Sequence, residues 1–208
     1  MTRAGPSFTP DYFAGLYAGD PDPWRFASSD YERDKYAATL AHLPRDRYAA
    51  ALEIGCSIGV FTRSLTERCD ALLALDVVPS VLDAARARCA DRPNVRFALQ
   101  AVPGEWPEGR FDLIVIAEVA YYLDRADLAR LAGRVAGAMN PGGDIVLVHW
   151  TGQTDYPLSG DEAADAFIAQ AGFARVLHRA RTDRYRLDVL RAGTAESEAA
   201  RLPPERAF

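Results

Sequence analysis

Apolar runs of strand length alternate with helix-like segments between residues 48 and 150. This alternation is typical of a parallel sheet that is covered by helices on both faces. We therefore predict an α/β protein with five parallel strands. The expected strands are residues 48–55, 71–77, 95–101, 111–119 and 144–150, and the expected intervening helices are residues 59–68, 79–90 and 125–139.

The C-terminal part of the pattern predicts an antiparallel hairpin. A helix is expected at about residues 160–171, followed by strand-like runs at 173–181 and 184–192. Only Thr182 and Asp183 separate these runs, and so short a connection joins antiparallel strands. The NPGG segment, residues 140–143, is expected to be a turn before the fifth strand.

These elements predict a Rossmann-like, seven-stranded, mostly parallel sheet that is closed by a reversed pair of strands. We associate that arrangement with class I methyltransferases, because nicotinamide-binding dehydrogenases have a second half that is also parallel. The chain then divides into an N-terminal helical lid (residues 1–47), a cofactor-binding domain (48–192) and a flexible tail (193–208). In the lid, helices are expected at about residues 8–17 and 29–42.

Composition narrows the possible partners. The 208 residues carry a net charge of −5 and no block of Lys and Arg, which argues against a nucleic-acid substrate. No apolar run approaches the roughly 20 residues that span a bilayer, so we expect no membrane partner and a cytoplasmic location. The three cysteines lack a CxxC pair, which argues against a metal site and disulfides, and Cys69 and Cys89 are expected to be buried in helices.

The first expected strand ends in a motif that suits a cofactor with a positive pole. Glu53 places an acid at the strand end, and small residues follow it through a tight turn, so that the backbone can approach a ligand. A carboxylate there would attract the ammonium or sulfonium of S-adenosylmethionine and repel a pyrophosphate. The expected cofactor contacts in this turn are Gly55, Cys56, Ser57 and Gly59.

The ends of the next three strands extend the predicted cofactor site, because ligands bind outside the carboxyl ends of parallel strands. Asp76, beside Val77, stands about 20 residues beyond the glycine turn, the spacing at which an acid accepts hydrogen bonds from both ribose hydroxyls. The third strand end is expected beside the adenine, and the fourth beside the methionine end and the acceptor. Their residues are Gln100, Ala101 and Val102, and Ala117, Glu118 and Val119.

Several segments of the chain resemble the nodulation protein S methyltransferases. The segments are EIGCSIGVFT, LDVVPSVLDAARAR, FDLIVIAEVAYYLD, NPGGDIVLVHW and PWRFASSDYERDKYAATL. The PW…YERDKY and AEVAYYL segments are the most specific to that family, whereas Ser57 stands where class I enzymes usually have glycine. The resemblance implies S-adenosylmethionine-dependent N-methylation of the free amine of a deacetylated chitooligosaccharide or another amino sugar, with S-adenosylhomocysteine as the product.

An amine acceptor must lose a proton before it attacks the methyl group, and the sequence offers four candidates for this part of the site. Glu118 could hold the cationic amine, His149 could act as the base, and Tyr121 and Tyr122 could stack on a sugar ring. The expected lid also carries side chains that could close over the cofactor and exclude water. These are Trp24, Arg25, Tyr31 and Tyr36.

Three other functions fit parts of the pattern. The first is a methyltransferase that acts on a hydroxyl or amine of another small molecule in secondary metabolism. The second is an NAD(P)-dependent reductase, since Tyr31 and Lys35 have the Y-x-x-x-K spacing, but this pair precedes the glycine turn and Ser57 and Val60 stand where glycines are needed. The third is a non-catalytic module that binds the cofactor. The oligomeric state, monomer or homodimer, is not encoded in any motif.

Overall fold

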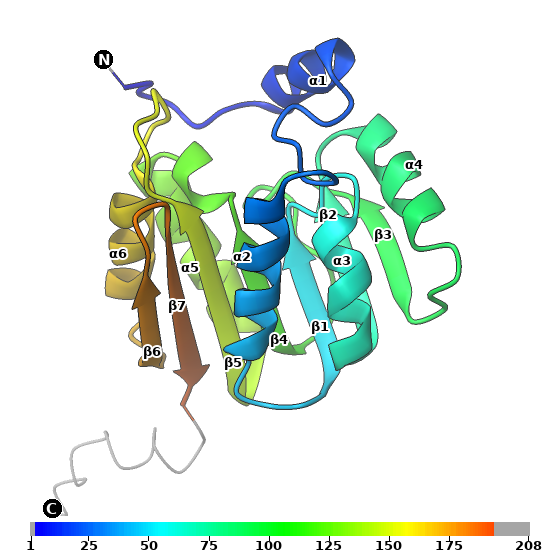
Figure 1. Ribbon diagram of the computed structural model, residues 1–208. Coiled ribbons are helices and arrows are strands. Elements are labelled where there is room, and N and C mark those ends of the chain that lie inside the picture. Colours follow the sequence, from blue (N-terminus) through cyan, green and yellow to red (C-terminus); the bar gives the residue numbers. More distant parts are fainter. Residues whose placement is uncertain (1–2, 194–208) are drawn as a thin grey trace, which may run out of the picture.

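The computed structural model describes residues 3–193 and contains one seven-stranded sheet with helices on both faces (Figure 1). The tail expected at residues 193–208 lies, apart from Gly193, outside the described residues. The strands are β1 (Tyr48–Ile54), β2 (Cys69–Asp76), β3 (Val95–Leu99), β4 (Phe111–Ala117), β5 (Met139–Trp150), β6 (Ala174–Arg181) and β7 (Tyr185–Ala192). The α-helices are α1 (Pro10–Gly19), α2 (Asp30–Ala41), α3 (Val60–Leu65), α4 (Pro79–Arg88), α5 (Arg125–Ala138) and α6 (Gly160–Gln170).

The strand order is β3-β2-β1-β4-β5-β7-β6, which confirms the predicted sheet with its C-terminal hairpin. The pairs from β3 to β5 are parallel, and β7 is antiparallel to both β5 and β6. The expected reversed pair is therefore one reversed strand, β7, because the hairpin returns β6 to the common direction. The chain leaves β1 toward β2 on one side and later enters β4 on the other, and a ligand crevice opens at such a switch point.

Two local predictions were wrong. The NPGG segment is not a turn before β5 but an irregular part of that strand: Met139 pairs with Phe111 and Asp144 already pairs with Leu113. Gly142, with φ of 73°, lets these extra residues bulge from the ladder. The cysteine prediction also fails in part, since the buried Cys69 begins β2 instead of lying in a helix.

Polar side-chain caps mark where α2 and α5 begin. The Ser29 side chain accepts a hydrogen bond from the backbone N–H of Glu32 at the start of α2. The carboxylate of Asp124 accepts from the N–H groups of Ala126 and Asp127 at the start of α5. The helix after the glycine turn is shorter than the expected range of 59–68. The α-helix α3 ends at Leu65, and the chain continues as a 3₁₀ turn, Thr66–Arg68.

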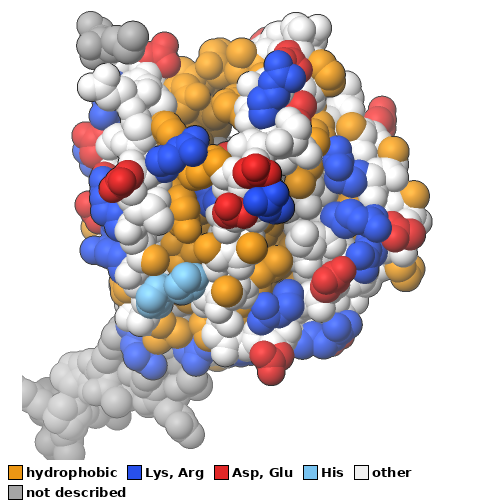
Figure 2. All heavy atoms as spheres, in the orientation of Figure 1, with side chains coloured by type: hydrophobic (Ala, Val, Ile, Leu, Met, Phe, Trp, Pro, Cys, Tyr) orange, Lys and Arg blue, Asp and Glu red, His pale blue; other side chains and the backbone are white. Residues whose placement is uncertain are grey.

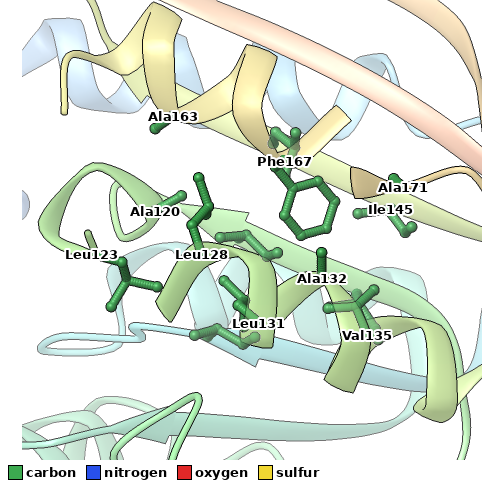
Figure 3. Packing of buried hydrophobic residues seen from close by; sticks show 14 of the residues in the cluster. Ala120, Leu123, Leu128, Leu131, Ala132, Val135, Ile145, Ala163, Phe167 and Ala171 are labelled. Atoms are coloured by element: carbon green, nitrogen blue, oxygen red, sulfur yellow. The ribbon is translucent and has the colours of Figure 1, made fainter. Parts of the chain in front are cut away.

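Alternating side chains of the central strand β4 enter two separate cores. Leu113 and Val115 pack toward α2 and α3, whereas Ile114 and Ile116 pack toward α5 and α6. Figure 3 shows the second core, in which Phe167 of α6 points at the side chains of α5. All four β4 residues are fully buried, so both faces of the sheet support the strand ends rigidly.

The N-terminal segment contributes two helices with different positions. Helix α2 lies against the same sheet face as α3, where Tyr36 and Leu40 pack on the core. Helix α1 lies beyond the carboxyl ends of the strands (Figure 1), and the N–H of Phe8, just before it, donates to the carbonyl of Tyr122 at 2.9 Å. The segment from α1 to α2 therefore borders the crevice that the strand ends form.

Candidate functional site

A cavity of about 520 Å³ lies at the carboxyl ends of the parallel strands, below α1 and beside α2. Figure 2 shows hydrophobic side chains gathered around a hollow on this side of the molecule. Of the residues that the sequence singled out, the cavity brings together Trp24, Tyr31, Tyr36, Glu53, Gly55, Cys56, Ser57, Asp76, Val77, Gln100, Ala101, Val102, Ala117, Glu118, Val119, Tyr121 and Tyr122. Three of them, Arg25, Gly59 and His149, do not line it.

The two glycines of the turn after β1 serve different contacts. Gly55 has φ of 81°, and a Cβ there would lie 2.3 Å from Val119 Cγ2, so only glycine lets the turn pass the end of β4. Gly59 has φ of 77°, and its Cβ would lie 2.9 Å from the Cα of Ala85 on α4. Gly59 is therefore required by the packing of α3 on α4, which explains why it stands outside the cavity wall.

Ser57 occupies the position at which class I enzymes usually have glycine, and its backbone keeps the left-handed conformation with φ of 48°. Its hydroxyl shares a hydrogen bond with the hydroxyl of Tyr17 on α1. Its backbone N–H donates to Asp76 Oδ2 at 2.8 Å. The left-handed backbone of a serine is strained, but the hydrogen bond of its side chain to Tyr17 connects α1 to the turn.

The half-buried Asp76 and the fully buried Glu53 differ in their hydrogen bonding. Asp76 accepts bonds from the N–H groups of Ser57, Val77 and Val78, and these bonds oppose the rise of its pKa that burial causes. Glu53 is 2% exposed, and burial raises its pKa to about 7, while the Thr62 hydroxyl opposes the shift. Within residues 3–193, Glu53 Oε2 has no hydrogen-bond partner. A buried carboxyl with a free oxygen is suited to a cationic donor from a ligand.

Glu118 is held by a network that sequence reasoning only partly identified. Its Oε1 binds the ammonium of Lys35, and its Oε2 accepts from the Tyr121 hydroxyl at 2.7 Å and from the Trp150 N–H at 2.8 Å. Lys35 also lies 2.9 Å from Glu32. The pKa of Glu118 is lowered: burial alone would raise it, but the charge and hydrogen bond of Lys35, together with His149 and the N–H of Trp150, outweigh that effect. Its backbone is left-handed, with φ of 57°.

Two of the remaining candidates lie away from the cavity wall. His149 is fully buried, and its Nε2 accepts from the N–H of Ala120 at 3.2 Å. Burial lowers the pKa of His149 to about 4, so the ring is neutral near pH 7. The exposed Arg25 points to Asp20, with 3.5 Å between their charged atoms.

Tyr121 and Tyr122, which the sequence predicts as a stacking surface, belong to a larger aromatic wall of the cavity that also includes Phe8, Phe13 and Tyr156. Its rings are in mutual contact, with the centroids of Tyr122 and Tyr156 4.6 Å apart and those of Phe13 and Tyr122 4.9 Å apart. Burial raises the pKa of both Tyr121 and Tyr122 well above its usual value, which keeps these hydroxyls protonated. The other cavity residues that were missed include Phe8, Phe13, Tyr17, Glu32, Lys35, Trp150, Tyr156 and Arg184.

One signal could have revealed the α2 part of this set. Tyr31, Glu32, Lys35 and Tyr36 stand at i, i+1, i+4 and i+5, which places them on one side of a helix. The sequence analysis assigns Tyr31 and Tyr36 to the lid that covers the cofactor, and considers Lys35 only as part of a reductase-like spacing. For the aromatic residues of the 150–156 loop no periodic signal exists.

A comparison of the whole chain with known families decides its relationship. The family model described as nodulation protein S matches residues 17–142, which is more than half of the chain. The chain belongs to the nodulation protein S family. Nodulation protein S of Rhizobium tropici is 38% identical over 128 residues, which are 61% of this chain and 54% of that protein. The chain therefore spans about half the length of this relative.

Solved structures confirm the fold of this family member. A Pseudomonas syringae protein assigned as a methyltransferase is 38% identical, with a TM-score of 0.69 over 77% of this chain and 98% of that chain. The N-methyltransferase NodS from Bradyrhizobium japonicum WM9, in complex with S-adenosylhomocysteine, has a TM-score of 0.74 and 23% identity, and the match covers 88% of this chain and 97% of that chain. The expected class I methyltransferase fold is thereby confirmed. Both solved proteins are described as methyltransferases, and the NodS structure contains S-adenosylhomocysteine.

Metal and membrane features complete the description of this family member. Among residues 3–193, no group of three or more His, Cys, Asp or Glu side chains is arranged to hold a metal ion. In the same part of the chain, no helix is long and apolar enough to cross a bilayer.

Proposed function

We propose that this protein is an S-adenosylmethionine-dependent methyltransferase that N-methylates the free amine of an amino sugar or a deacetylated chitooligosaccharide-like acceptor. The observation that carries the proposal is one cavity with two chemically distinct ends. One end has two acids, the buried Glu53 and the half-buried Asp76, and a glycine turn. The other end has the ionised Glu118 surrounded by aromatic rings.

The residues at the first end fit the cofactor. S-adenosylmethionine supplies an electrophilic methyl group on a cationic sulfur, together with an ammonium, two ribose hydroxyls and an adenine. The free Oε2 of Glu53 suits the ammonium, and Asp76 can accept from the ribose hydroxyls. Gln100 Oε1, which is buried and unpartnered in the described chain, suits a donor such as the adenine amino group. The proposed product is S-adenosylhomocysteine.

At the second end, Glu118 would hold the amine by charge. Because its pKa is lowered, the carboxylate stays ionised near pH 7 and stabilises positive charge on the nitrogen as the new N–C bond forms. The protonated Tyr121 and Tyr122 cannot act as bases at that pH, and His149 does not reach the cavity. The amine therefore loses its proton to water before attack, and the protein contributes alignment and a pocket that excludes water.

The experiment measures methylated product by mass spectrometry with glucosamine oligomers and their N-acetylated counterparts, which differ only at the nitrogen. We expect product from the free amine alone. Glu118→Gln should lower kcat/KM by about tenfold to a hundredfold, whereas the exposed Glu108→Gln, outside the cavity, should leave it unchanged. Methylation of the N-acetylated oligomer, or of a hydroxyl in both, would instead support the small-molecule O-methyltransferase alternative.

A further inference from the structure

Arg184 is a solvent-exposed cation on the cavity wall, and no carboxylate of residues 3–193 forms an ion pair with it. Two cationic side chains line the cavity, Lys35 and Arg184. Lys35 is paired with Glu32 and Glu118. No carboxylate of residues 3–193 lies within salt-bridge distance of Arg184, although its neighbours Arg181 and Arg186 are each paired with aspartates of α6.

The position of Arg184 is nevertheless well defined. Its carbonyl accepts from the N–H of Thr151 at 2.9 Å, and its N–H donates to the hydroxyl of Thr182 at 3.2 Å, so the backbone is fixed on both sides. The guanidinium carbon lies 3.6 Å from the ring centroid of Tyr31 and 5.2 Å from that of Trp150. Contacts with both rings, which are nearly perpendicular to each other at 83°, hold the guanidinium in place while its N–H donors stay available.

A buried polar group without a partner lies on the same wall. The hydroxyl oxygen of Tyr31 is buried and has no hydrogen-bond partner in residues 3–193. The Tyr31 ring also lies 5.1 Å from the ammonium of Lys35, so two cations converge on it. A purely cationic acceptor would be repelled by Arg184, whereas an oxyanion could bind the guanidinium through charge-assisted hydrogen bonds, with the Tyr31 hydroxyl on the same wall as a further donor.

We propose that Arg184 selects acceptors that carry an oxyanion, a phosphate or a carboxylate, beside the amine that is methylated. This inference rests on the proposed N-methyltransferase function and adds to it a preference, among amino-sugar acceptors, for those that carry an acidic group. Glu118 would bind the amine and Arg184 the oxyanion, so that two side chains of opposite charge hold the acceptor in one orientation.

The test is calorimetric binding to the full-length protein saturated with S-adenosylhomocysteine. The probes are glucosamine, glucosamine 6-phosphate and muramic acid, which separate a neutral, a phosphorylated and a carboxylated amino sugar. At least one acidic probe should bind about tenfold more tightly than glucosamine, and its affinity should fall with added salt. Arg184→Gln should remove this preference, and Arg181→Gln, a change in the same hairpin outside the cavity, should retain it. Equal affinities for all three probes, or a preference that survives Arg184→Gln, would overturn the inference.

The binding readout keeps the inference separate from the proposed function. An acidic probe that binds through Arg184 but yields no methylated product contradicts the methyltransferase proposal for amino sugars and leaves the anion site in place. Conversely, methylation of glucosamine with a kcat/KM equal to that of its acidic derivatives contradicts the anion site alone. With an acidic acceptor, Arg184→Gln should raise KM and leave kcat near the wild-type value.

Discussion

The ammonium of Lys35 on α2 is bonded to the carboxylate of Glu118 at the end of β4, although 83 residues separate them. Both side chains are largely buried, with exposures of 2% and 14%. This ion pair connects the N-terminal segment to the proposed methyl-acceptor side of the cavity, and it keeps Glu118 ionised where burial alone would favour the neutral acid.

Lys35→Met should destabilise the protein and change the charge of the site. Removing one partner leaves Glu32 and Glu118 buried beside each other without a cation, which costs about 3–5 kcal/mol for pairs of this kind. The free energy of unfolding in urea measures the change, and the exposed Arg33→Met on the same helix is the control, with an expected change below about 1 kcal/mol. Equal effects of the two substitutions would refute a special role for the buried pair.

Affinity for S-adenosylmethionine should decrease as the pH falls below about 7, because Glu53 must lose its proton to pair with the ligand ammonium. The raised pKa of Glu53 also affects stability. Protonated Glu53 contributes to the free energy of unfolding. This contribution is fully present below the pKa of the unfolded chain, near 4.5, and is lost as the pH rises through about 7. Calorimetric titrations from pH 5.5 to 8 measure the first effect. The Glu53→Gln variant should bind S-adenosylmethionine more weakly than the wild type, and its affinity should change little over this pH range. A variant whose affinity depends on pH as the wild type's does would contradict the assignment of Glu53 to the ligand ammonium.

Ser57 should show opposing effects of strain and hydrogen bonding. Ser57→Ala loses the bond to Tyr17 but keeps the left-handed backbone, so we expect a loss of about 1 kcal/mol of stability. Ser57→Gly also loses the bond but relieves the strain, and should be about 1 kcal/mol more stable than the alanine variant. Thermal unfolding of both variants and of Tyr17→Phe checks this ranking, and an alanine variant as stable as the glycine variant would disprove it.

Gly59 should matter for folding even though it does not line the cavity. Gly59→Ala forces a Cβ to 2.9 Å from Ala85 at a positive φ, and should cost about 2 kcal/mol or more of stability. Gly133→Ala, on the exposed side of α5 with no atom within 4 Å, should instead stabilise by about 1 kcal/mol. The two variants separate the cost of steric clash from the general preference of helices for alanine over glycine. The midpoint of chemical unfolding measures the change in stability of each variant.

The sheet and the cofactor turn could be predicted because each depends on local patterns. The continuous apolar run of β4 and the glycine turn after Glu53 are visible in the sequence, as is the spacing to Asp76. The Lys35–Glu118 pair was missed because nothing in sequence places α2 against the end of β4. The sequence did not show that His149 stands off the cavity wall: successive residues of a strand alternate in direction, and its ring packs inside the protein beside Tyr121. The bulge at Gly142 was read as a turn because turns and bulges use the same residues.

The most direct measurement is the affinity of S-adenosylhomocysteine for the wild-type protein and for Asp76→Asn, determined by isothermal titration calorimetry. Asparagine is nearly isosteric with aspartate but lacks the charge and one of the two acceptor oxygens. The ribose hydroxyls therefore lose one acceptor for their hydrogen bonds. We expect saturable binding with one ligand per chain and an affinity at least about tenfold lower for Asp76→Asn. No binding to the wild-type protein, or equal binding to both, would contradict a cofactor site at these strand ends.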